Sequence, residues 1–543
     1  MNPLPRTLVT ALAAVPALGL VVFYFWPLTT LLVEAIDGRS VSDALTRHQT
    51  WDVVWFTTWQ ALVSTALTIA VGLAPAYLIA RYEFVGRRQL VAVLTALFVL
   101  PTVVMGAAML ALLPDSFDRT VWTVIAAHVL FNLAIVVRVI GTMWEHLPID
   151  MEGAAATLGA TRWQVFREIS LPLLRPTIVG AAAIVFLFAF TSFGVIRILA
   201  APGTRTIEVE VWRRATQLGD IGGAAVLSLL QLAVLGLVVL WTSTAQRRYG
   251  RPIDVRVHAR RRRARGRRER SVVAVISGLT FAVALTPLVA LTIRSFSTPS
   301  GWSTTAWRTL GRSEVRPGIR IGVDPVAALG QSVQTAAWAT TFAVVVGGLA
   351  SLAIVAARRS GRLLDIGLML PVGTSAVTIG FGMLITFDTP PTDWRAAWWL
   401  VPVGHALIAV PFVVRTTNGV LQAIDPRLSD AAATLGASPT RAWRAVVVPY
   451  LWRPLMVGAG LAAAISLGEF GATSFLSRSG DETLPIVIEK LLGRTGSLLQ
   501  AQGYALATVL AIATITIALM IERAGDTAAI PGRRGTRRSD GRY

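Results

Sequence analysis

Apolar stretches long enough to cross a membrane recur about a dozen times along this chain of 543 residues. A hydrocarbon core about 30 Å thick requires roughly 20 apolar residues for each helical span. Only 15% of the residues are charged and 54% are hydrophobic, a balance that a water-soluble domain with a solvated surface does not show. The sequence therefore predicts an all-α polytopic membrane protein with about 12 transmembrane helices.

The predicted spans form two groups of six. The first group covers residues 8–33, 53–80, 89–113, 120–143, 176–200 and 222–243, and the second covers 271–295, 331–357, 363–387, 396–418, 455–477 and 502–521. This division gives a first half in residues 1–245, a linker in 246–270, a second half in 271–521 and a basic tail in 522–543. The first apolar run exceeds the roughly 7–15 residues of a secretion signal, so we interpret it as a membrane anchor.

Basic residues predict the orientation of the spans. The formal net charge is +20, and the arginines gather in connections between apolar runs. Short basic loops face the cytoplasm, which places both termini there. No aromatic or groove-reading element interleaves with the arginines, so we expect no nucleic-acid partner. The linker has 12 arginines from Gln246 to Arg270, and this composition predicts a solvated segment that can touch anionic lipid headgroups. The loop arginines are Arg81, Arg87, Arg88, Arg358, Arg359 and Arg362.

The two halves repeat each other at an offset of 277 residues. The heptapeptide from Ala154 to Ala160 recurs from Ala431 to Ala437. Because each half has an even number of spans, both copies enter the membrane in the same direction, and a solute pathway is expected between them. The same offset pairs His128 with His405, Arg138 with Arg415, Pro172 with Pro449, and Phe193 with Phe470.

The duplicated heptapeptide lies in two expected cytoplasmic loops, at about 148–175 and 425–453. Its alanines favour an α-helix, and Gly159 and Gly436 can adopt the left-handed conformation that ends such a helix. Thr161 with Gln164 three positions on predicts a capping box. Each loop should therefore hold two short helices around a tight turn. In the later copy, Ser438 and Pro439 are expected to start the second helix. Pro172 in the first copy and Pro449 in the second are expected to end the second helix of their loop.

This pattern, Glu-Ala-Ala, three residues, Gly and later Ile-x-Leu-Pro, resembles the coupling loop of permease subunits in ATP-binding-cassette importers. The resemblance implies two tandem six-helix type I permease repeats in a bacterial cytoplasmic membrane, an ATPase dimer that grips both loops, and an extracytoplasmic solute-binding protein. The first copy has Gly153 where the family has its acid, with Glu152 one position earlier. The residues implied to contact the ATPase are Glu152, Ala154, Ala155, Gly159, Thr161, Phe166 and Pro172, then Asp430, Ala431, Ala432, Gly436, Ser438, Trp443 and Pro449.

The chain is not expected to be an enzyme. A phosphate-binding loop needs Gly-x-x-x-x-Gly-Lys-Ser/Thr, and the sole lysine, Lys490, precedes a leucine. ATP and Mg²⁺ would therefore be bound by the partner ATPase, and no cofactor by this chain. There is no cysteine, and we predict no metal site.

Ionisable residues inside spans are functional candidates by default. Glu469 lies in the eleventh predicted span, and Ser192 is its counterpart in the first half. One hypothesis is a pathway that contacts a polar or cationic solute, and the other is a carboxylate that is hydrogen-bonded within the bundle. For His128 and His405 an interhelical hydrogen bond is favoured over a ligand role.

The fused two-half arrangement resembles the ferric iron and thiamine permeases, most clearly in residues 190–208 and 466–485. Thiamine, being cationic, would suit Glu469, whereas iron would arrive as a hard ion that prefers oxygen ligands. The alternative class is a twelve-span, ion-coupled secondary transporter, which also has two parallel halves and a Gly-Arg-Arg loop, here Gly86 to Arg88. That class gives no reason for the duplicated alanine-rich loops.

Overall fold

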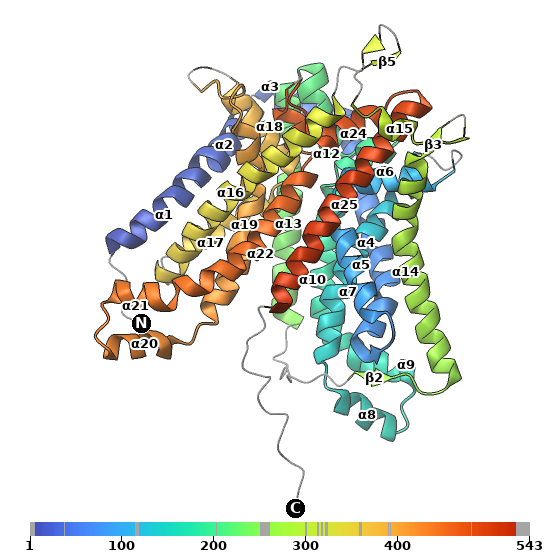
Figure 1. The fold of residues 1–543 in the computed structure, drawn as a ribbon, viewed down its shortest axis with the longest axis vertical. Coiled ribbons are helices and arrows are strands. Elements are labelled where there is room, and N and C mark those ends of the chain that lie inside the picture. Colours follow the sequence, from blue (N-terminus) through green and yellow to red (C-terminus); the bar gives the residue numbers. More distant parts are fainter. Residues whose placement is uncertain are drawn as a thin grey trace, which may run out of the picture.

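The computed structural model describes residues 6–36, 38–114, 119–201, 203–249, 261–298, 301–311, 314–316, 319–320, 324–357, 361–388, 390, 392–478 and 480–527. Long helices lie side by side in one bundle (Figure 1). Ten of them are long and apolar enough to cross a membrane, or up to 12 if two bent pairs each count as one span. The prediction of an all-α membrane protein with about 12 spans is confirmed.

The elements of the first half follow one another in this order: α1 (Arg6–Leu20), the π-helix η1 (Val21–Phe25), α2 (Trp26–Ile36), α3 (Gly38–Thr46), α4 (His48–Arg81), β1 (Tyr82–Glu83), α5 (Arg87–Val99), α6 (Thr102–Leu112), α7 (Val121–His146), α8 (Ile149–Thr157), α9 (Arg162–Val165), the π-helix η3 (Phe166–Ser170), α10 (Leu171–Phe190), α11 (Gly194–Leu199), α12 (Ile207–Arg213), the π-helix η4 (Arg214–Leu218) and α13 (Ile221–Tyr249).

The linker and second half contain β2 (Arg262–Arg263), α14 (Arg267–Ser295), β3 (Ser297–Thr298), β4 (Gly301–Trp302), α15 (Thr305–Arg308), β5 (Glu314–Arg316), β6 (Ile319–Arg320), α16 (Pro325–Ala357), α17 (Gly361–Met369), the 3₁₀ helix η5 (Leu370–Gly373), α18 (Ala376–Phe387), α19 (Leu400–Gln422), α20 (Pro426–Thr434), α21 (Pro439–Val446), α22 (Val448–Gly468), α23 (Thr473–Leu476), α24 (Leu484–Leu492) and α25 (Ser497–Thr527).

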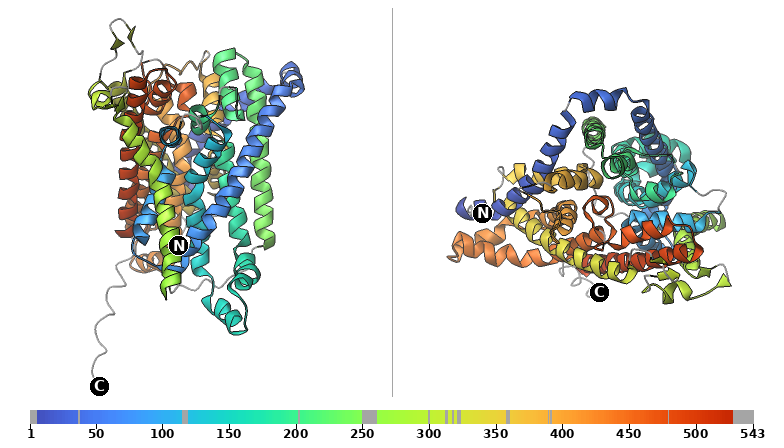
Figure 2. Two further views of the ribbon diagram at one scale, coloured as in Figure 1. Left: turned by 90° about the vertical axis from the view of Figure 1, so that its right-hand side faces the viewer. Right: turned by 90° about the horizontal axis from the view of Figure 1, so that it is seen from above.

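The sequence repeat is also a structural repeat. In the first half α4, α7 and α10 pack against one another, and in the second half α16, α19 and α22 do the same. The first helix of each half crosses to the other half, since α1 packs on α16 and α14 packs on α5 and α6. Seen from above, the two sets of helices lie next to each other (Figure 2). The exchanged helices hold the halves together around their shared interface.

Four predicted spans differ from the observed helices. The spans at 89–113 and 363–387 are bent by 109° and 101°. In the first, Pro101 has no N–H to donate and holds the preceding Leu100 in a non-helical conformation (φ −58°, ψ 114°). The predicted fifth and eleventh spans, 176–200 and 455–477, are each interrupted after residues 190 and 468, where the chain turns at the interface between the halves. Hydropathy does not register such breaks, because the residues on both sides are apolar.

The two ends of the bundle differ. The paired short helices α8–α9 and α20–α21 lie at one end, together with the start of α1 and the last turns of α25, whereas α12 and α24 lie toward the other (Figure 1). The short strand β1 pairs in parallel with β2 from the linker, at the same end as α8 and α9. Of the arginines that indicated a cytoplasmic side, Arg358 and Arg359 lie outside the described residues, as does Arg260 of the linker.

Candidate functional site

In both alanine-rich loops a short helix ends at a tight turn and a second helix follows, as predicted, but in the first copy that second helix runs on into α10. Gly159 and Gly436 have φ angles of +87° and +81°. In the first copy, the N–H of Ala160 donates to Ala155 O at 3.0 Å and the N–H of Gly159 donates to Ala156 O at 3.1 Å. This pair of bonds is a Schellman motif, which satisfies carbonyls that the end of α8 would leave unpaired. The second copy makes the equivalent bonds at 3.1 and 3.0 Å.

The second helix of each loop is capped as the sequence predicts. Thr161 Oγ1 accepts from the N–H of Gln164 at 3.3 Å, and Gln164 Oε1 accepts from the N–H of Thr161 at 2.8 Å, which completes the capping box. Ser438 Oγ accepts from the N–H of Arg441 at 3.4 Å. These bonds fix the direction in which the chain leaves each turn.

The prediction that the prolines end these helices is wrong for Pro172, but it agrees with the second copy, where α21 ends at Val446, three residues before Pro449. The helix that begins at Arg162 continues through Pro172 to Phe190. The π-helix η3 precedes Pro172, so the missing N–H of the proline falls where the α-helical hydrogen-bond pattern is already interrupted. Pro449 lies in the first turn of α22, where no N–H is needed. The first loop is therefore continuous with α10, whereas Val447 separates the second loop from α22.

Apolar side chains at the tips of the loops face outward. Leu158 and Leu435 occupy the same position in the repeat, and each is 88% exposed. Trp163 is also exposed, but Phe166 stacks on Trp144 with ring centroids 5.8 Å apart, within its own chain. Trp443 likewise packs on the cluster around Leu421. Sequence reasoning overlooked the two leucines, although each directly precedes the turn glycine in the duplicated heptapeptide.

The alanines of the duplicated heptapeptide lie on the surface of the loops. Ala154 and Ala431 are exposed, and Ala155 and Ala432 are half-buried. Their small side chains leave the backbone of α8 and α20 accessible to a partner.

Glu152 anchors the first loop. Its Oε1 accepts from Arg81 Nη2 at 2.6 Å and from Ser170 Oγ at 3.0 Å. The Arg81 side chain is 6% exposed, so this carboxylate neutralises a nearly buried charge at the end of α4. Glu152 thus joins α8 to the end of α4 and to η3. Asp430 lies exposed on α20.

The described part of the linker is docked beside this loop. Arg262 Nη2 donates to Tyr82 Oη at 2.6 Å, and its guanidinium carbon lies 4.9 Å from the centre of the Tyr82 ring. Tyr82 in turn donates to Glu269 Oε1 at 2.7 Å. Burial and the neighbouring Glu269 carboxylate raise the pKa of Tyr82 to about 12. Arg261 pairs with Glu145 just before α8. Most of residues 261–270 are exposed, as a solvated linker predicts. The contacts of Arg261 and Arg262 with the first half are additional, because local charge does not reveal long-range pairing.

The breaks after α10 and α22 meet at the interface between the halves. Phe193 and Phe470, equivalent in the repeat, stack with ring centroids 5.1 Å apart. Beside them, Glu469 Oε1 accepts from the N–H of Ala472 at 2.9 Å, in the turn that precedes α23. Ser192 is buried, and its hydroxyl has no hydrogen-bond partner among the described residues. Both candidate pathway residues thus flank the aromatic contact between the halves.

The two equivalent histidines are bonded differently. His405 makes hydrogen bonds through both ring nitrogens, to Ser466 Oγ at 2.8 Å and to Thr473 Oγ1 at 2.7 Å. His128 contacts Ser64 Oγ at 3.4 Å. The favoured interpretation, an interhelical hydrogen bond, is therefore confirmed for both, with the shorter bonds at His405. Among the described residues no group of three or more metal-ligating side chains is found.

A cavity of about 160 Å³ lies next to the aromatic contact, with walls from both halves. Arg197 on α11 forms an ion pair with Glu489 on α24, across the interface. Its guanidinium carbon also lies 4.0 Å from the centre of the Trp212 ring. Lys490 Nζ pairs with Glu482 at 2.6 Å. The lining residues are Phe193, Arg197, Trp212, Phe470, Thr473, Ser474, Ser477, Arg478, Glu482, Ile486, Glu489 and Lys490.

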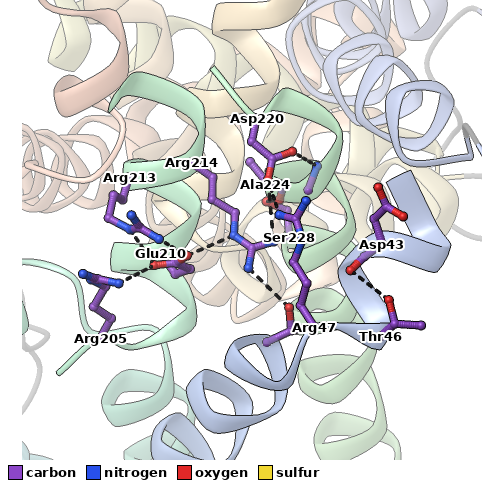
Figure 3. Close-up of polar contacts among 12 residues, drawn as sticks. Asp43, Thr46, Arg47, Arg205, Glu210, Arg213, Arg214, Asp220, Ala224 and Ser228 are labelled. Carbon is purple, nitrogen blue, oxygen red and sulfur yellow. Dashed lines mark hydrogen bonds and ion pairs between the residues drawn. The ribbon is translucent and has the colours of Figure 1, made fainter. Parts of the chain in front are cut away.

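A buried ionic network supports the α12 side of this cavity (Figure 3). Glu210 Oε1 accepts from Arg213 Nη2 at 2.7 Å and from Arg214 Nε at 3.0 Å. Arg214 also donates to Thr50 Oγ1 at 3.3 Å, which ties α12 and η4 to the start of α4. Burial alone raises the pKa of Glu210, but the two arginines outweigh it and hold the pKa below its ordinary value. The wall that carries Trp212 is therefore fixed in place.

Comparison with known proteins follows the same division into halves. The family model described as "binding-protein-dependent transport system inner membrane component" matches twice, at residues 69–248 and 339–523. The chain is 25% identical over 518 residues to the thiamine transport system permease protein of Escherichia coli K12, covering 89% of each chain. It is 26% identical over 535 residues to that of Brucella abortus strain 2308, covering 92% of each. A putative 2-aminoethylphosphonate transport system permease protein of Salmonella typhimurium is 31% identical over 189 residues, 34% of this chain and 69% of that one.

Proposed function

Because the chain belongs to the inner membrane components of binding-protein-dependent transport systems, we propose that it forms the solute pathway of a thiamine importer and that α8–α9 and α20–α21 bind a separate ATPase. The fused arrangement of two permease repeats supports the first part, as does the likeness to thiamine permeases over 89% or more of the chain. A role in transport rather than catalysis follows from the family itself.

The matched geometry of the two loops carries the second part of the proposal. The first helix of each loop ends in the same Schellman turn, and each loop presents one exposed leucine, Leu158 or Leu435, at the same end of the bundle. An exposed apolar side chain that costs free energy in water is suited to fill a pocket on a partner. Two such anchors fit an ATPase dimer, which presents two equivalent grooves.

We place the loop end of the bundle in the cytoplasm of a bacterial cell membrane, with both ends of the chain on that side. Arg81, Arg87 and Arg88 lie near that end, in agreement with positive-inside topology. The cavity between α12 and α24 then faces outward, where a solute-binding protein delivers its ligand. The arginines of the linker would lie at the level of the anionic headgroups of the inner leaflet.

The ATPase contact is tested by co-purification of the partner with the intact permease. Leu158→Asp together with Leu435→Asp should remove the ATPase from the purified complex. Val85→Asp is the matched control, because Val85 is also a fully exposed apolar residue, in the connection between β1 and α5. Retention of the ATPase by the double leucine variant, or its loss from the Val85 variant, would contradict this assignment.

Solute identity is tested with the complete importer in proteoliposomes that contain ATP. We expect accumulation of radiolabelled thiamine that requires the binding protein and the ATPase. Uptake of ferric iron in place of thiamine would overturn the solute. Thiamine uptake that persists without the ATPase and collapses with an ionophore would instead identify an ion-coupled secondary transporter.

A further inference from the structure

The cavity between α11, α12 and α24 already holds a planar cation, the guanidinium of Arg197. It lies on the face of Trp212 and pairs with Glu489. An indole face and a carboxylate are the two groups that recognise a flat positive charge. We propose, building on the proposed function, that this cavity is a solute subsite for a planar organic cation, which takes the place of the Arg197 guanidinium on Trp212 and Glu489.

The size of the cavity agrees with a site that is closed around its own side chain. Pockets for drug-sized ligands measure about 300–1,000 Å³, whereas this one measures about 160 Å³. A solute with two rings does not fit unless a lining side chain leaves. Arg197 is the long side chain at the centre of the contacts, and its departure would free both the aromatic face and the carboxylate.

Unpaired donors in the lining indicate what else the solute carries. Trp212 Nε1 and Arg197 Nε are buried and have no hydrogen-bond partner among the described residues. A buried donor without an acceptor costs free energy, so such groups commonly mark a binding position. A planar cation that stacks on Trp212 and carries an oxygen on a side chain could reach this donor, which points outward in the plane of the indole ring.

The charge of the lining argues against a bare inorganic cation. Three basic residues, Arg197, Arg478 and Lys490, face two acidic ones, Glu482 and Glu489. Glu482 is paired with Lys490 and Glu489 with Arg197. Any cation meets this net positive lining, so the solute must gain affinity from the Trp212 face as well as from Glu489, which a planar organic cation does by stacking.

The exchange would also act on the interface between the halves. Arg197 belongs to the first half and Glu489 to the second, so their ion pair ties α11 to α24. A solute that captures Glu489 removes this tie beside the stacked Phe193 and Phe470. Binding of the solute thereby weakens the closed arrangement of the halves.

The test uses the complete importer and a pair of probes of the same shape. Benzamidinium is a planar cation, and benzamide is its neutral counterpart. Benzamidinium should raise the melting temperature of the permease and inhibit thiamine uptake competitively, and benzamide should do neither. Trp212→Leu and Glu489→Gln should each raise the KM for thiamine by about 5- to 30-fold, with kcat changed less. If the Trp212→Leu variant fails to fold, Glu489→Gln alone still tests the subsite.

Arg197→Gln gives the discriminating result. Removal of the competing guanidinium should lower the KM for thiamine severalfold, whereas a merely structural arginine would raise it when lost. Arg478→Gln is the matched control, since it removes a different positive charge from the lining of the cavity. An equal fall in KM for both variants, or equal effects of the two probes, would overturn the subsite. If thiamine is not transported but benzamidinium stabilises the wild type and not Glu489→Gln, the proposed solute fails and the subsite stands.

Discussion

Replacement of Gly159 by valine tests whether the turn between α8 and α9 is the conformation that the ATPase binds. The φ angle of Gly159 is +87°, and a Cβ built there meets no atom within 4 Å. A substitution therefore adds backbone strain without a steric clash. The left-handed conformation costs an L-residue roughly 1–2 kcal/mol, and a β-branched residue is especially unfavourable there.

The strain translates directly into affinity. If the loop must adopt this turn to dock, 1–2 kcal/mol reduces the competent population about 5- to 30-fold. The measured dissociation constant of purified ATPase for the detergent-solubilised permease should rise by that factor. Gly436→Val should act in the same way on the second loop, because its φ angle is +81° and its surroundings are equally open.

Two controls separate strain from added bulk. Gly153→Val adds the same side chain to α8, where the backbone is helical and no atom lies within 4 Å of the new Cβ. Gly159→Asn keeps the left-handed conformation accessible, because asparagine tolerates it. Both should bind the ATPase within about twofold of the wild type. Wild-type affinity of Gly159→Val, or an equal loss in Gly153→Val, would refute the reasoning.

Three further outcomes follow from the polar contacts. His405→Leu should destabilise the permease by about 1–3 kcal/mol in thermal unfolding, and the equivalent His128→Leu by less, because only His405 makes two short hydrogen bonds; equal losses would contradict this. Glu152→Gln should lower stability by about 1–3 kcal/mol, since the nearly buried charge of Arg81 loses its carboxylate, and an unchanged melting temperature would show that the pair is dispensable. The lowered pKa of Glu210 means that its stabilisation is complete above the ordinary carboxyl value of about 4.3 and is lost as the pH falls through the folded value. Melting curves from pH 7 to 3 should show this acid loss in the wild type and not in Glu210→Gln.

Features set by a few neighbouring residues could be predicted from the sequence. The turn at Gly159 and the capping box at Thr161 depend on hydrogen bonds within six residues, and both are confirmed. Repeat matching also located the equivalent helices, because duplication preserves spacing. Long apolar runs predicted the number of spans, since the bilayer requires length and hydropathy and little else.

Features that depend on distant partners could not be predicted. The ion pair of Arg197 with Glu489 joins residues 292 positions apart. Glu152 looked like a displaced family acid, and only the fold shows that it reaches Arg81. The sequence places α1 in the first half, but the structure packs it on the second. In each case the contact depends on which helices pack together, and hydropathy does not predict that packing.

The duplication gives the Arg197 contact an evolutionary meaning. At the offset of 277 residues, Trp212 corresponds to Glu489 and Arg197 to Ser474. The guanidinium thus lies between two positions that descend from one ancestral position. Two identical subunits would carry the same residue at both, either two tryptophans or two glutamates. Encoding both halves in one gene allowed them to diverge, so that natural selection could set an aromatic face opposite a carboxylate.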